Sequence, residues 1–200
     1  MMDLTEAGLV QLARRFYPTD YPVTKDEYDS EGLLPFQRTP EHARYLEAWD
    51  KAMVWPEWKT LIQEMHSKFD AIADSTQPWV TACRKCCVYV DRPLPNGALH
   101  VTRVAAAVSV LAPLYVTYCT TSIIVDRQEF DTCLLFDFPD EVKPHAATLS
   151  ALVERILGYQ ALPLQFAQVQ VLRARVPHVR TDREPTLLDA FFDSMLESLF

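Results

Sequence analysis

Five cysteines are the residues with the widest range of possible chemistry: Cys83, Cys86, Cys87, Cys119 and Cys133. Cys83 and Cys86 form a C-x-x-C pair, a spacing that occurs in zinc sites. A structural zinc site needs four ligands, usually from two such pairs, whereas Cys119 and Cys133 are single and no histidine pair has ligand spacing. On a strand, Cys83 and Cys86 would point to opposite faces. We therefore expect no metal and keep a small zinc-stabilised interaction module as an alternative, with Cys83, Cys86 and Cys87 as its candidate ligands.

Thiol catalysis requires a histidine close to the nucleophile and a third group that orients it. No histidine lies in a recognisable motif, and the sequence lacks G-x-S-x-G, H-E-x-x-H and phosphate-binding glycine loops. With four glycines in 200 residues, glycine-rich cofactor loops are excluded. An enzyme that uses Cys86 or Cys87, or a carboxylate pair such as Asp137 and Asp140, remains an alternative. We predict a protein that is not an enzyme and has no catalytic residues and no cofactor.

Acidic residues outnumber basic ones, which gives a net charge of -8. This balance argues against a nucleic-acid binder, which needs excess Lys and Arg to displace counterions. It favours a basic partner, and the alternative interpretation is a charge that serves solubility alone. A proline-rich segment over 19–38 contains an acidic cluster, which we predict to be the partner-binding patch. A solvated loop is the alternative interpretation. The residues of the cluster are Asp26, Glu27, Asp29 and Glu31.

The odd number of cysteines, all in the middle of the chain, does not suggest a disulfide framework. No basic n-region precedes an apolar segment at the N-terminus, and the longest apolar run, 104–116, is shorter than the about 20 residues of a membrane span. These features predict a cytoplasmic protein without membrane contact. Nothing in the sequence sets the oligomeric state.

The segment 79–138 must form the framework that positions these residues. It is rich in Val, Ile, Thr, Tyr and Cys, and turn residues divide it, with Asn96-Gly97 as the clearest turn. We predict an antiparallel meander, with small residues on both faces of its second strand for close packing against a helix. Its strands are expected at 79–92, 99–111, 115–125 and 130–138.

Helical patterns flank this segment on both sides. Helices are predicted over 4–17, from Thr39-Pro40 to Ile72 with a break at Pro56, and over 149–156 with Gly158 at the C-cap. A final helix begins at a T-x-x-D cap, Thr186 to Asp189, and a possible edge strand covers 166–172. The prediction is one α+β domain over 1–200, with a helical part at 1–75, a sheet of four to five strands at 79–138, and a C-terminal part at 142–200.

Three segments carry a family resemblance: the strand AVSVLAPLYVTY at 107–118, LGYQALP at 157–163 and PTLLDAFF at 185–192. Here the chain resembles small bacterial immunity proteins of polymorphic or contact-dependent toxins, notably of the myxobacterial kind. It departs from their pattern at 183–185, where Arg-Glu-Pro stands in place of a glycine-rich turn. The resemblance implies a cytoplasmic protein that binds and neutralises a cognate toxin, and it implies no catalytic residues.

Overall fold

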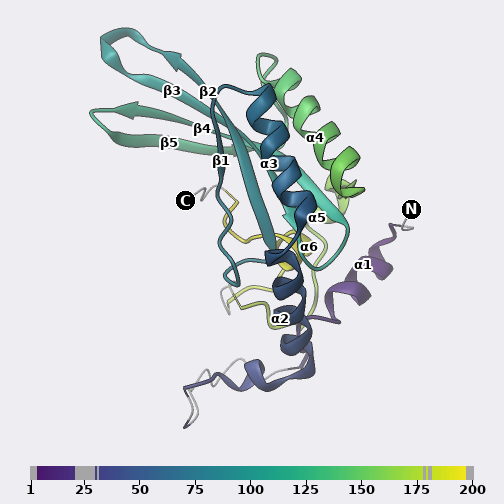
Figure 1. Cartoon of the computed structure of the whole chain (residues 1–200). Coiled ribbons are helices and arrows are strands. Elements are labelled where there is room, and N and C mark those ends of the chain that lie inside the picture. The colour runs from purple at the N-terminus through teal and green to yellow at the C-terminus, as the bar shows by residue number, and fades with distance from the viewer. Residues whose placement is uncertain (1–3, 21–29, 31, 178, 180–181, 197–200) are drawn as a thin grey trace.

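A six-stranded sheet forms the centre of the computed structural model, which describes residues 4–20, 30, 32–177, 179 and 182–196 (Figure 1). Five antiparallel strands lie side by side in chain order, and β6 (Gln160–Ala161) pairs in parallel with β4. The predicted α+β class with an antiparallel sheet flanked by helices is therefore confirmed. The five strands are β1 (Ile72–Asp74), β2 (Cys83–Pro93), β3 (Leu99–Ser109), β4 (Leu114–Val125) and β5 (Gln128–Leu135).

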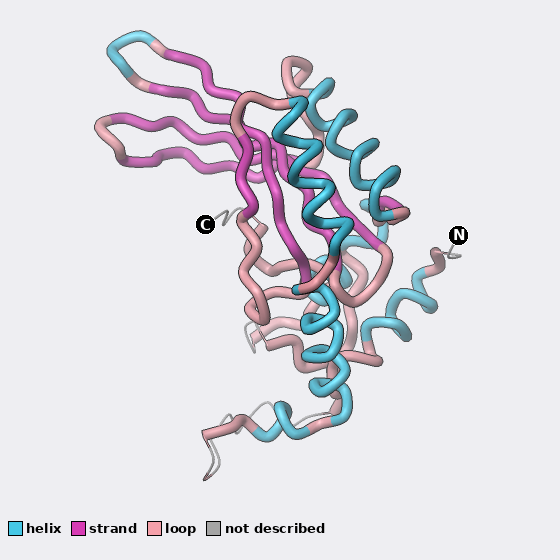
Figure 2. Tube along the Cα trace, in the orientation of Figure 1, coloured by secondary structure: helices cyan, strands magenta, loops and turns pink. Residues whose placement is uncertain are grey.

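Helices cover both faces of this sheet, as Figure 2 shows in cyan. We call the side covered by α3 and α4 the α4 face, and the side covered by α1, α2, α5 and α6 the α1 face. The helices are α1 (Glu6–Ala13), α2 (Pro40–Met53), α3 (Pro56–Lys68), α4 (Lys143–Leu157), α5 (Leu164–Ala167) and α6 (Leu187–Phe191), with short 3₁₀ turns η1 (Pro35–Arg38) and η2 (Pro95–Gly97). Within the described residues no helix is long and apolar enough to cross a bilayer.

Pro56 divides the long helical pattern between the two faces. The proline has no backbone N–H, so α2 ends before it and α3 begins at it. Trp49 of α2 is buried on the α1 face, whereas Trp58 of α3 is buried on the α4 face. Trp55, between the helices, contacts both clusters. The predicted break at Pro56 is thus the point where the chain crosses from one face to the other.

The centre of β3 is buried on both sides. Ala105 and Ala107 contact the α1-face cluster, while Ala106 contacts the α4-face cluster, and all three are fully inaccessible. Small side chains let the helical layers approach the backbone closely, as predicted. A large side chain here would clash with the densely packed interior.

Several boundaries differ from the predictions. The helix expected to reach Ile72 ends at Lys68, and the chain turns into β1, which pairs with β2. The edge strand predicted at 166–172 is wrong: the first part forms α5, and Gln170 makes only an isolated bridge with Thr186. The last helix ends at Phe191, because Phe192 leaves the helical conformation.

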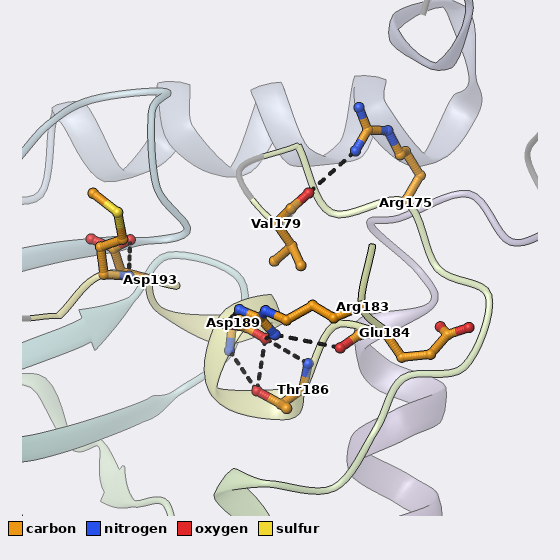
Figure 3. A network of polar contacts seen from close by, with 8 residues as sticks. Arg175, Val179, Arg183, Glu184, Thr186, Asp189 and Asp193 are labelled. Carbon is orange, nitrogen blue, oxygen red and sulfur yellow. Dashed lines mark hydrogen bonds and ion pairs between the residues drawn. The ribbon is translucent and has the colours of Figure 1, made fainter. Parts of the chain in front are cut away.

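Polar contacts within the C-terminal segment (Figure 3) and one ion pair to β2 hold this segment on the α1 face. The predicted Thr186–Asp189 cap is present as a capping box. Arg183 donates two hydrogen bonds to Asp189, at 2.6 and 2.9 Å, which holds the loop before α6. Asp193 lies farther along the same segment, and its Oδ2 accepts from Nζ of Lys85 on β2 at 2.9 Å. Sequence-distant groups therefore determine where the C-terminal segment lies.

Candidate protein-docking site

The outer part of the sheet projects beyond the helices (Figure 1). We call this part, residues 89–103 and 120–134, the extension. β3 and β4 stay paired along its whole length, as far as Leu99 opposite Ile124. Several apolar residues of the extension belong to neither hydrophobic cluster of the protein. Among them are Leu94, Leu99, Val101, Ile123, Ile124, Val125 and Phe130.

Side chains of the extension itself cover its α1 face. Arg103 on β3 reaches across β4 to Glu129 on β5, where Nη1 and Oε1 are 2.7 Å apart. Its guanidinium also lies over the Tyr89 ring on β2, 5.8 Å from the centroid. Ser122, beneath this bridge, is almost fully buried. The α1 face of the extension therefore has a strip of paired polar groups across four strands.

This strip predicts a pH-dependent stability. The hydrogen bond from Arg103 lowers the pKa of the Glu129 carboxyl below its usual value. A depressed carboxyl pKa stabilises the folded state above the unfolded pKa, and this stabilisation is lost as pH falls through the folded pKa. We expect Glu129→Gln to lower the free energy of unfolding by about 0.5–1 kcal/mol at pH 7, the range for a partly exposed ion pair. In urea titrations the difference from wild type should shrink below about pH 4; a difference unchanged at low pH would contradict the role of the charge.

The α4 face of the extension has no such cover. Phe130 on β5 lies directly opposite Ile123 on β4, and Val125, two residues along, points to the same side because side chains alternate. Phe130 is 48% exposed and Val125 is 39% exposed. An aromatic side chain and neighbouring branched residues on a bare sheet face resemble the apolar anchors at the centre of protein–protein interfaces.

The outer edge of β5 is less suited to docking than this face. Among the described strands, β5 pairs only with β4. The pairing shifts register between Thr121 and Ile123, and Asp131 has a positive φ of 54° at the irregularity. Bulges and charged residues on an edge strand obstruct further strand pairing. We therefore assign docking to the bare face.

Four of the five cysteines are buried, whereas Cys133 is exposed on β5 within the extension, on the same face as Phe130. As predicted for a strand, Cys83 packs in the α1-face cluster and Cys86 in the α4-face cluster. Burial raises the pKa of Cys83 to about 12 and that of Cys119 to about 11, and it also raises the pKa values of Cys86 and Cys87. No group of three metal-ligating side chains occurs among the described residues.

These thiols give a direct test of the cysteine-nucleophile alternative. In the native protein, iodoacetamide at pH 7.5 should modify the exposed Cys133 and leave the four buried thiols unmodified. Unfolding in guanidinium should expose all five, as counted by mass spectrometry. Cys133→Ser is the control and should abolish native labelling. Rapid native modification of Cys86 or Cys87 would instead support a nucleophile.

The predicted acidic patch, Asp26, Glu27, Asp29 and Glu31, lies outside the described residues. Of the predicted carboxylate pair, Asp140 forms an ion pair with Lys143 at 2.6 Å, and Asp137 is exposed. Sequence reasoning missed the bare face around Phe130. A signal was available, because Phe130 and Val125 are apolar residues on either side of the Asp126-Arg127-Gln128 turn, where polar residues are usual.

Comparisons with known proteins identified no relative of this chain. No family model matches the chain, no curated protein matches it, and no solved structure matches it.

Proposed function

We propose that this protein binds a bacterial protein toxin and neutralises it in the cytoplasm. The observation that carries the proposal is the bare apolar face of the extension, where Phe130 and Val125 are exposed on hydrogen-bonded strands. A preformed face of this kind binds without a large ordering cost. Neutralisation itself, as opposed to binding, rests on the resemblance described above.

Charge favours a basic partner. The protein as a whole has a net charge of -8, whereas the extension itself is nearly balanced, with four acidic and three basic residues. An acidic surface accelerates association with a cationic protein and discriminates against acidic ones. A basic toxin, such as a nuclease, fits this balance.

Co-expression tests the function. The toxin encoded beside the gene for this protein should kill host cells when expressed alone, and the wild-type protein should restore growth and co-purify with that toxin. A non-cognate toxin of the same activity class is the control and should remain lethal. Death of cells that express both the adjacent toxin and soluble wild-type protein would refute the proposal.

A further inference from the structure

A small hollow lies where the extension meets the helices. It has a volume of about 380 Å³, near the lower end of the range for ligand pockets, about 300–1,000 Å³. The turn after α3, the N-terminal part of α4 and strand β2 form its walls. Val90 lines it and belongs to the extension, so the hollow adjoins the bare α4 face. Its chemically informative lining residues are Lys68, Phe69, Asp70, Asp91 and His145.

The hollow combines aromatic surface with negative charge. Phe69 and His145 stack with ring centroids 5.9 Å apart and an interplanar angle of 26°. Nδ1 of His145 is inaccessible to solvent and has no hydrogen-bond partner among the described residues. Asp70 and Asp91 are exposed at the rim, and neither forms an ion pair with a described residue at the distances of the other pairs in this protein. Two acidic residues, Asp70 and Asp91, and one basic residue, Lys68, thus line the hollow.

We infer that this hollow receives a basic side chain, an arginine above all, from the toxin that docks on the extension; this rests on the proposed function. A guanidinium is planar, stacks on aromatic rings and donates several hydrogen bonds. It would stack against Phe69 and His145 and pair with Asp70 or Asp91. The hollow therefore contributes specificity for a basic partner on the β2 side of the sheet, whereas the apolar anchor at Phe130 lies on β5, at the other side.

A larger groove between α3 and α4 is a poorer candidate. Its volume is about 610 Å³, and its lining includes Ala147, Ala151 and Leu152. Glu64 and Arg155, which also line it, pair with each other at 2.7 Å. Glu64 and Arg155 therefore already neutralise each other within the protein. The carboxylates of Asp70 and Asp91 at the smaller hollow form no such ion pair with a described residue.

The first experiment compares toxin binding by the full-length protein and two double variants, using the toxin made inactive in its catalytic site. Asp70→Asn/Asp91→Asn should weaken binding about tenfold or more at 150 mM salt, since charge-assisted contacts are lost. The matched control, Asp50→Asn/Glu57→Gln, removes two exposed charges from α2 and α3 and should bind within about twofold of wild type. Equal affinity of the two variants would overturn the inference and leave the proposed function standing.

The second experiment does not depend on the toxin. N-acetyl-arginine amide, titrated into ¹⁵N-labelled wild-type protein, should shift amide resonances at 68–71, 88–91 and 145, and the neutral N-acetyl-glutamine amide should not. Asp70→Asn/Asp91→Asn should suppress these shifts. The inference fails if both compounds give the same response or if shifts occur only elsewhere. Wild-type protein that responds to the arginine compound but binds no adjacent toxin would refute the proposed function alone.

Discussion

Replacing Asp193 with alanine should lower the free energy of unfolding by about 3–5 kcal/mol, the cost of breaking a buried ion pair by removing one partner. Lys85 is fully inaccessible and Asp193 is 7% exposed. Little water can therefore solvate the Lys85 ammonium once the Asp193 carboxylate is removed. A buried ammonium is costly because the low-dielectric interior stabilises it much less than water does. This is the largest stability effect that we expect from a single polar substitution in the protein.

Urea denaturation followed by circular dichroism measures the effect. Lys85→Met/Asp193→Leu serves as the companion variant, because replacing both charges with apolar groups is often nearly neutral. It should recover most of the stability that Asp193→Ala loses. If Asp193→Ala unfolds with a free energy within about 1 kcal/mol of wild type, the spread usual for surface changes, the pair does not hold the C-terminal segment.

Replacing Phe130 with alanine should weaken toxin binding by at least about 2 kcal/mol, or about 30-fold, the threshold for an interface anchor. Phe130 belongs to neither core cluster and is 48% exposed, so the loss of stability should be small. The change removes an aromatic group that the partner would otherwise cover, which should appear mainly as faster dissociation.

Surface plasmon resonance on the inactivated toxin measures this change. Leu172→Ala is the matched control: Leu172 is 50% exposed but lies in the C-terminal segment, away from the extension. It should bind as wild type does. If the Phe130→Ala variant dissociates from the toxin as slowly as wild type does, the partner docks elsewhere.

Local sequence patterns specified much of the fold. Turn residues and β-branched runs located the meander, and Pro56 and Gly158 marked helix boundaries that the structure has at the same places. The errors arose where tertiary contacts overrode a local pattern. Ile72 fits a helical stripe, yet it pairs with Val88 in the sheet. The segment after Pro163 has β-rich composition, yet its first part forms α5 and Gln170 makes only an isolated bridge with Thr186.

The candidate site was harder to predict, because it depends on which surfaces remain uncovered. Phe130 and Cys83 are both apolar residues predicted on strands, and strand periodicity alone does not say which of them a helix covers. The burial of Lys85 depends on Asp193, which is 108 positions away, so no local pattern indicates it. Five cysteines drew attention to possible metal or thiol chemistry, whereas four of them pack in the interior.

The central claim is that the bare α4 face of the extension contacts the toxin. Amide hydrogen exchange of the full-length protein, alone and bound to the inactivated toxin, tests it most directly. The account predicts slower exchange on binding at 121–134 and at 88–91, with α1 and α2 unchanged. Protection confined to α1, α2 or the C-terminal segment, with the extension exchanging as in the free protein, would contradict it.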